Sequence, residues 1–123
     1  VFVIYFYPKN FTPGCTKEAC SFRDSYADFK ALGADILGVS SDNTNSHARF
    51  ADKYSLPFTM LSDPGGKIRK KFGVKSDLLG LIPGRETFIF DKQGKLVLRY
   101  NSLKAQSHIT KAMEAVKNLN NEN

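Results

Sequence analysis

The spacing of apolar residues over the first third of the chain predicts a strand, a loop and a helix. Residues 1–7 form a continuous apolar and aromatic run, which is typical of a buried strand. Residues 8–14 have the composition of a loop. From near Cys15 apolar side chains recur at helical spacing, and we expect Gly33 to end the helix. The apolar stripe of this helix consists of Cys15, Ala19, Phe22, Tyr26 and Phe29.

The middle of the chain repeats this alternation. Residues 34–40 predict a second short buried strand, and a helix should follow through about Tyr54. Pro57 interrupts the chain, and the FTML segment after it, residues 58–61, predicts a third strand. The SDPGGK segment is a turn, and a short helix is expected over residues 67–72.

The last third of the chain predicts a hairpin and a final helix. Residues 74–84 show no clear period and are expected to form a loop. Residues 86–90 and 95–100 flank a DKQG turn, which is a strong hairpin signal. The tail at residues 120–123 is expected to fray. The final helix carries one apolar face, made of Ile109, Met113, Val116 and Leu119.

The resulting order is β-α-β-α-β-α-β-β-α. Strands that alternate with helices favour an α/β fold, and the closing hairpin adds antiparallel strands. The pattern therefore predicts a thioredoxin-like core, with a central mixed sheet and helices on both sides. The length of 123 residues and the apolar content of 41% suit a single domain over residues 1–123.

Composition and charge exclude some function classes. No apolar run approaches the roughly 20 residues of a membrane helix. The net charge is +6, from 18 basic and 12 acidic residues, and the densest basic stretch is Lys67 to Lys75. We interpret this stretch as a solvated helix face, with Ile68 and Phe72 toward the core, and expect no nucleic-acid partner.

The chain starts without Met and inside an apolar run, so we expect a piece that has lost an N-terminal segment.

The only two cysteines, Cys15 and Cys20, are five positions apart. They are too few for a secreted disulfide scaffold and too far apart for a C-x-x-C motif, which suits a reducing compartment. Cys15 follows a strand and opens a helix, where unpaired N–H groups and the helix dipole favour the nucleophilic thiolate. Thr12 can cap this helix and hydrogen-bond a ligand, and Gly14 allows close approach of a small molecule.

A lone cysteine at a helix start is more often a small buried hydrophobe than a nucleophile. The pattern of Pro8, Thr12 and Cys15 favours the nucleophile. The segment FYPKNFTPGCTKEACSFRD, residues 6–24, resembles the active-site signature of peroxiredoxins, and more narrowly that of the peroxiredoxin Q branch, also called bacterioferritin comigratory protein. The segments SLPFTMLSD, PGRETFIFDKQG and YNS…HI are similar to the same branch, especially to its plant plastid and cyanobacterial members.

The resemblance implies a role for each matching residue. Cys15 matches the peroxidatic cysteine, and Thr12 matches the threonine that hydrogen-bonds the peroxide and the thiolate. Pro8 matches the proline that shields the site from water. Arg85 matches the arginine that stabilises the thiolate and the transition state; considered alone, it would be a surface ion pair. Glu18 matches the glutamate that orients this arginine, although an acid in a first helical turn also suits the helix dipole. Substrate contacts would come from Thr12, Gly14, Cys15 and Arg85.

Cys20 matches the resolving cysteine of those members that have one, which implies a Cys15–Cys20 disulfide. On a regular helix two such residues have Cα atoms roughly 8.5 Å apart and side chains that diverge by about 140°. A disulfide tolerates at most about 7 Å between Cα atoms, so the first turns of the helix must unwind. The resemblance further implies a hydroperoxide substrate, a thioredoxin or glutaredoxin-type reductant, and no metal, flavin or haem.

Other interpretations remain open. A thioredoxin-like disulfide oxidoreductase without peroxidase activity is the main alternative, and the C-x4-C spacing is unfavourable for it. A non-catalytic protein that binds through its basic face is a third. His47 and His108 are predicted at helix starts, as surface or capping residues. The resemblance implies a chloroplast protein, or alternatively a bacterial cytoplasmic one, and an intrachain disulfide suits a monomer.

Overall fold

A five-stranded mixed sheet forms the centre of the computed structural model, with the strand order β3-β2-β1-β6-β7. β1 is parallel to β2, and β2 is parallel to β3, whereas β6 runs antiparallel to both β1 and β7. The predicted mixed sheet with a closing hairpin is confirmed. The strands are β1 Phe2–Phe6, β2 Asp35–Ser40, β3 Thr59–Ser62, β6 Glu86–Phe90 and β7 Leu96–Asn101. The structure describes residues 1–74, 76–77, 82–83, 85–102 and 104–121.

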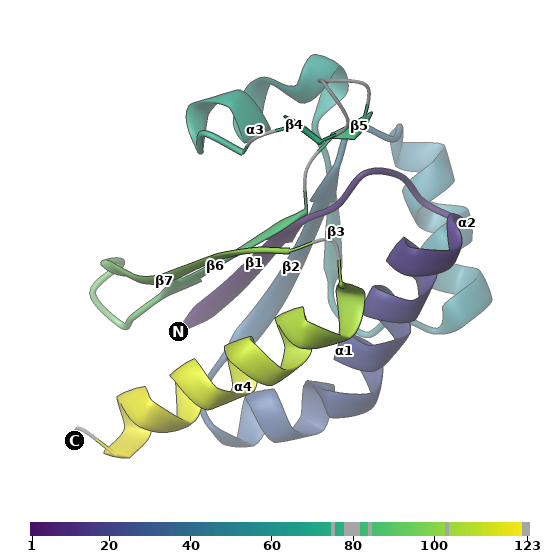
Figure 1. The fold of residues 1–123 in the computed structure, drawn as a ribbon. Helices are drawn as coiled ribbons and strands as arrows, with labels where there is room; N and C mark the ends of the chain where they lie inside the picture. Colours follow the sequence, from purple (N-terminus) through teal and green to yellow (C-terminus); the bar gives the residue numbers. More distant parts are fainter. Residues whose placement is uncertain (75, 78–81, 84, 103, 122–123) are drawn as a thin grey trace.

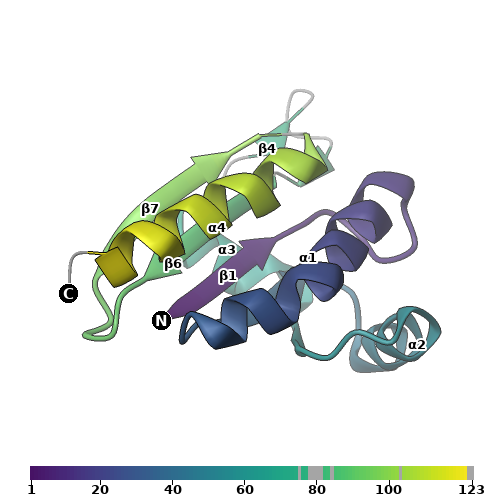
Figure 2. The same cartoon turned by 90° about the horizontal axis from the view of Figure 1, so that it is seen from below.

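Helices cover both faces of this sheet. α1 and α4 lie side by side on one face, α3 lies on the opposite side, and α2 packs beside β3 (Figures 1 and 2). Within the described ranges, no helix has the length and apolar composition to cross a membrane. The helices are α1 Pro13–Ala31, α2 Thr44–Tyr54, α3 Lys67–Lys71 and α4 Ala105–Asn121, with a short 3-10 turn, η1, at Pro64–Gly66.

β1 is apolar at every position because it is central and both of its faces are covered. Val3 and Tyr5 are fully buried in the core cluster that α1 and α4 close. Phe6 points to the other face, where it packs with Val39 and Phe88. The continuous apolar run at the start of the chain is therefore a buried central strand, as predicted.

The predicted stripe of α1 faces this core. Cys15, Ala19, Phe22 and Phe29 are buried, and Tyr26 packs against them while partly exposed. The helix begins at Pro13, just before Cys15, because the fixed φ of proline suits the first helical position and its missing N–H costs nothing there. Gly33, at φ 80°, takes the left-handed conformation that closes the helix end.

Three predictions were wrong in the second half of the fold, on the loop at residues 74–84, the burial of Ile68 and the C-terminal tail. Residues 76–77 and 82–83 pair as two short antiparallel strands, β4 Ser76–Asp77 and β5 Ile82–Pro83, inside the predicted loop; the rest of that loop at 75, 78–81 and 84 lies outside the described residues. Ile68 is 38% exposed rather than buried, although Phe72 does pack on Phe6 and Phe88.

The predicted frayed tail is the third detail. α4 continues to Asn121, and the Asn120 side chain donates a hydrogen bond to the Leu32 carbonyl at 2.9 Å. This bond links the end of α4 to the end of α1, which gives residue 120 a reason to stay helical. Residues 122–123 lie outside the described part of the chain.

Candidate active site

Cys15 lies in the first turn of α1, directly after the loop that follows β1. Its side chain is 1% exposed, and it packs in the same cluster as Tyr7 and Phe22. Thr12 occupies the position before the helix with extended backbone angles. The prediction that its side chain caps the helix was wrong, because it makes no hydrogen bond to the first turn. Its hydroxyl instead donates to the Lys9 carbonyl at 2.7 Å, which keeps the side chain within the loop.

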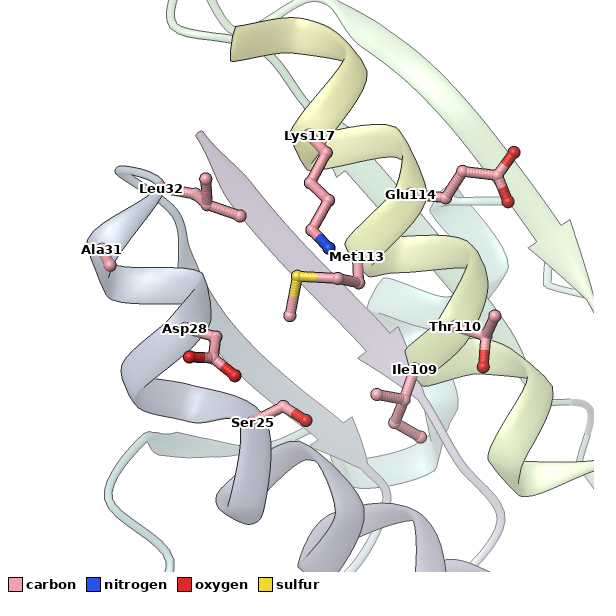
Figure 3. A pocket seen from close by; sticks show the side chains of 9 residues that line it. All are labelled: Ser25, Asp28, Ala31, Leu32, Ile109, Thr110, Met113, Glu114 and Lys117. Atoms are coloured by element: carbon pink, nitrogen blue, oxygen red, sulfur yellow. The ribbon is translucent and has the colours of Figure 1, made fainter.

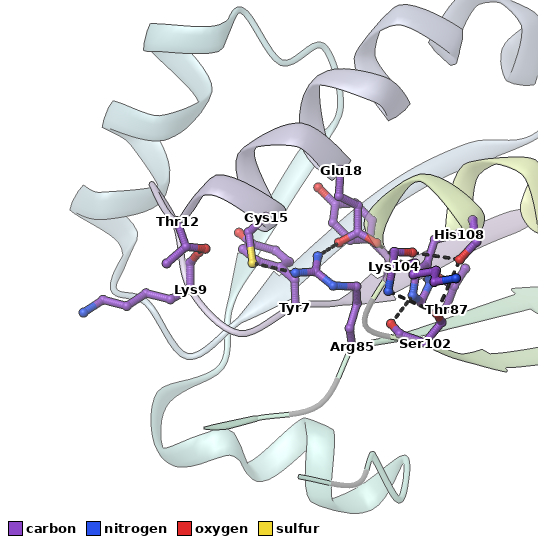
Figure 4. A network of polar contacts seen from close by, with 12 residues as sticks. Tyr7, Lys9, Thr12, Cys15, Glu18, Arg85, Thr87, Ser102, Lys104 and His108 are labelled. Atoms are coloured by element: carbon purple, nitrogen blue, oxygen red, sulfur yellow. Dashed lines mark hydrogen bonds and ion pairs between the residues drawn. The ribbon is translucent and has the colours of Figure 1, made fainter. Parts of the chain in front are cut away.

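Arg85 reaches Cys15 from the residue before β6, seventy positions away in the sequence. Nη2 of Arg85 donates a hydrogen bond to Cys15 Sγ at 3.4 Å, and Nη1 donates to Glu18 Oε1 at 2.5 Å (Figure 4). Arg85 is 5% exposed, so this is a buried fork rather than a surface ion pair. Because the donor is itself a cation, both hydrogen bonds of the fork are charge-assisted.

Gly14 makes room for this fork. A Cβ atom at Gly14 would lie 3.1 Å from Arg85 Nη2, the atom that donates to Cys15. The sequence predicted that Gly14 would admit a small ligand. The structure gives a further reason for glycine, which is the close approach of the guanidinium.

Glu18 is the carboxyl partner of Arg85, and it is fully buried. Burial raises the pKa of Glu18 to about 8, against the opposing pull of Arg85. Within the described residues, its second oxygen, Oε2, has no hydrogen-bond partner. Burial thus works against the charged form of the Glu18 carboxyl, while the hydrogen bond and the positive charge of Arg85 favour it.

The remaining predicted residues lie near this cluster. Cys20 is half-buried on the same continuous helix as Cys15, and both thiols are free. Pro8 is half-buried in the loop between β1 and α1, and its shielding role stays a prediction. One turn of helix thus holds Cys15 and Glu18, one loop holds Thr12 and Pro8, and Arg85 comes from a distant segment of the chain.

Comparison with known proteins identifies the family. Residues 1–99 match the model of a protein family described as the AhpC/TSA family. The chain belongs to this family. A chloroplastic peroxiredoxin Q of Sedum lineare is 52% identical over 118 residues, which are 95% of this chain and 63% of that protein. The chain therefore spans less than two thirds of the length of this relative.

Solved peroxiredoxin structures have the same fold. Peroxidoxin BcpB from Mycobacterium tuberculosis is 36% identical, with a TM-score of 0.87 over 96% of this chain and 79% of that one. A bacterioferritin comigratory protein of Xanthomonas campestris is 33% identical, with a TM-score of 0.88 over 97% and 79%. The resemblance to the peroxiredoxin Q branch and the thioredoxin-like fold are both confirmed.

His108 lies against this cluster, and the sequence analysis did not place it there. It was expected as a surface or capping residue, but it is fully buried. Its Nε2 donates to the Ser102 carbonyl at 2.7 Å, and its Nδ1 accepts from the Thr87 hydroxyl at 2.7 Å. Nδ1 also lies 3.8 Å from Glu18 Oε2 (Figure 4). Burial lowers the pKa of His108 to about 4, so the imidazole beside Glu18 is neutral.

A pattern in the sequence could have revealed this residue. Ala105 and Ala112 are buried on α4, and His108 lies between them at helical spacing. An apolar stripe that includes a histidine predicts a buried imidazole. His47 was also expected at the surface and is 4% exposed. Both histidines occur at helix starts, as predicted, but neither is a surface residue.

A groove elsewhere on the molecule does not belong to this site. It has a volume of about 840 Å³ and lies between α1 and α4 (Figure 3). Met113 extends from α4 into it, and the Lys117 side chain points along α4 toward Met113. The groove is lined by Ser25, Asp28, Ala31, Leu32, Ile109, Thr110, Met113, Glu114 and Lys117.

Among the described residues, no three His, Cys, Asp or Glu side chains lie close enough together to hold a metal ion.

Proposed function

We propose that this chain is a thiol peroxidase that reduces hydrogen peroxide and organic hydroperoxides through Cys15 and Cys20. The observation that carries the proposal is the hydrogen bond from the buried cation of Arg85 to Cys15 Sγ, at 3.4 Å. A helix start and a guanidinium together favour the thiolate, which is the nucleophile in thiol chemistry. The same guanidinium stabilises negative charge that develops on the peroxide oxygens.

In the first step the Cys15 thiolate attacks the terminal oxygen of the hydroperoxide. The O–O bond breaks as the S–O bond forms, sulfur loses two electrons, and the departing alkoxide or hydroxide takes up a proton. The products are a sulfenic acid on Cys15 and an alcohol or water. Thr12 is proposed to hydrogen-bond the peroxide, Pro8 to exclude water, and Glu18 to orient Arg85.

In the second step the Cys20 thiolate attacks the sulfenic sulfur. An S–S bond forms as the S–O bond breaks, the sulfenic oxygen leaves as hydroxide and takes up a proton to give water, and Cys15 and Cys20 become a disulfide. In the folded, reduced protein both residues lie in one regular helix, where their Cα atoms would be roughly 8.5 Å apart. That separation is too large for a disulfide, so the first turns of α1 must unwind before the bond can form. A dithiol reductant then attacks the disulfide and restores both thiols.

The names of two similar proteins support the substrate class and the compartment that we propose for this reaction. The Xanthomonas campestris structure is described as giving insight into alkyl peroxide reduction activity, and the Sedum lineare protein is named as chloroplastic. We propose organic hydroperoxides among the substrates, thioredoxin or a glutaredoxin-type protein as the reductant, and the chloroplast as the compartment. Because both cysteines belong to one chain, a monomer is sufficient for the cycle.

A disulfide oxidoreductase without peroxidase activity fits the site less well. Such an enzyme needs its two sulfurs close together in the folded state. In this protein Cys15 is buried and Cys20 lies more than one helical turn away, so the folded form suits a single thiolate that meets a small oxidant.

The test is peroxide consumption by the purified chain with thioredoxin, thioredoxin reductase and NADPH. We expect Cys15→Ser to abolish turnover. We expect Cys20→Ser to form the sulfenic acid at the wild-type rate, detected by dimedone trapping, and to recycle poorly. Turnover that survives in Cys15→Ser would refute the proposal, and insulin reduction without peroxide consumption would favour the disulfide oxidoreductase.

A further inference from the structure

Asn10 is a buried polar residue in the loop that leads into α1. Its exposed fraction is 3%, whereas Lys9 and Phe11 on either side are exposed and Thr12 is half-buried. Burial of an amide is costly unless its donors and acceptor find partners. The contacts of Asn10 therefore show what this position is built to do.

Four hydrogen bonds hold Asn10. Its backbone N–H donates to Asp42 Oδ2 at 2.8 Å. Its side-chain Nδ2 donates to Ser46 Oγ at 3.1 Å and to His47 Nδ1 at 3.0 Å. Its Oδ1 accepts from the Tyr7 hydroxyl at 2.5 Å. These bonds join the loop to the residue after β1, to the connection between β2 and α2, and to the first turns of α2.

The partners of Asn10 are themselves fixed. Asp42 Oδ2 also accepts from Ser40 Oγ at 2.7 Å, at the end of the central strand β2. Burial lowers the pKa of His47, so its ring is neutral and its Nδ1 can accept the amide hydrogen. Asn10 is thus anchored to groups that do not belong to the loop and that need not move when α1 changes.

Phe11, the next residue, is held in an unfavourable backbone conformation. Its φ of 65° is left-handed, which is uncommon for a residue with a bulky side chain. Its ring packs edge-on against Phe50 of α2 at 5.1 Å between centroids, and it remains 45% exposed. The backbone is therefore strained at Phe11, and this conformation persists because Asn10 before it and α1 after it are fixed.

We propose that Asn10 is a positioning residue that holds the loop before Cys15 in its folded form and sets the upstream end of the segment that unwinds. The proposal rests on the proposed function, because the unwinding serves the formation of the Cys15–Cys20 disulfide. With Asn10 in place, unwinding begins at Phe11. Without it, the loop from Pro8 onward is released as well, and the unwound form becomes more populated.

Asn10→Ala tests this, with Asn120→Ala as the matched control. Asn120 also makes a side-chain amide hydrogen bond, to the Leu32 carbonyl at the opposite end of α1. Each protein is mixed with hydrogen peroxide, quenched with an alkylating reagent, and analysed by intact mass for sulfenic acid, disulfide and sulfinic acid. We expect Asn10→Ala to convert sulfenic acid to disulfide about tenfold faster, a change of about 1.4 kcal/mol, and to yield less sulfinic acid in excess peroxide. Asn120→Ala should match the wild type.

Hydrogen exchange gives a second measurement that does not depend on peroxide chemistry. We expect peptides that cover residues 13–19 of the reduced protein to exchange faster in Asn10→Ala than in Asn120→Ala. Ser46→Ala, which removes one acceptor only, should show a smaller effect in the same direction and serves if Asn10→Ala does not fold. If the wild type forms no disulfide, the proposed function fails while the exchange result still decides the role of Asn10. Exchange and disulfide formation that match in Asn10→Ala and Asn120→Ala would overturn the inference.

Discussion

Replacing Glu18 with Gln keeps the shape of the side chain and its acceptor for Arg85, but removes a group that titrates. Burial raises the pKa of Glu18 to about 8 in the folded protein, whereas a glutamate in an unfolded chain has a pKa of about 4.3. Between these two values the folded protein holds a proton that the unfolded chain has released. The free energy of unfolding of the wild type therefore falls as pH rises through this window, and the contribution disappears in Glu18→Gln.

The expected size follows from the number of protons involved. One proton held by the folded state alone lowers the free energy of unfolding by about 1.4 kcal/mol for each pH unit gained. Between about pH 6 and about pH 7 the wild type should thus lose about 1.4 kcal/mol relative to Glu18→Gln. Other groups, including His47 and His108, are present in both proteins and cancel in the difference.

The assay is urea unfolding followed by circular dichroism at these two pH values. Asp24→Asn is the control, because Asp24 is an acid on the same helix whose side chain is 69% exposed and paired with Arg23. We expect its difference from the wild type to be the same at both pH values. If the difference between the wild type and Glu18→Gln were constant as well, Glu18 would be a permanent anion held by Arg85, and the reasoning would be wrong.

Two further substitutions test the fork of Arg85. Arg85→Lys cannot span both Cys15 and its carboxyl partner, so we expect the rate constant of Cys15 with peroxide to fall by about tenfold to a hundredfold, the size of one charge-assisted hydrogen bond. The exposed Arg99→Lys should leave the rate unchanged, and equal rates in both variants would contradict the role of the fork. Gly14→Ala should slow the peroxide reaction, because its methyl group displaces Arg85 Nη2, 3.1 Å away; an unchanged rate would count against this.

Long periodic elements could be predicted from the sequence because their spacing shows which face is buried. The stripe on α1 and the hairpin of β6 and β7 are examples, and both are confirmed. β4 and β5 could not be predicted, because two residues are too few to show an alternation. Ile68 was misplaced because α3 is only five residues long, and one turn of helix does not fix which side faces the core.

The site was predictable only as far as its local motif extends. The loop and first turn around Cys15 have a recognisable pattern, and Arg85 was found through the resemblance of a second segment. Asn10 was missed because its burial depends on partners far along the chain, and His108 was missed although its helical spacing with Ala105 and Ala112 indicated burial. The Asn10 side chain bonds to residues 36 and 37 positions away, and Thr87 bonds His108 from 21 positions away. Residue type alone made both look like ordinary surface groups.

The central claim is that Cys15 and Cys20 complete one catalytic cycle within a single chain. Its most direct test is the mass and disulfide mapping of the reduced protein after one equivalent of hydrogen peroxide. The account predicts a monomer that has lost two hydrogens, with a peptide linkage that joins Cys15 to Cys20. Two free thiols after the peroxide is consumed, or a disulfide between two chains, would contradict it.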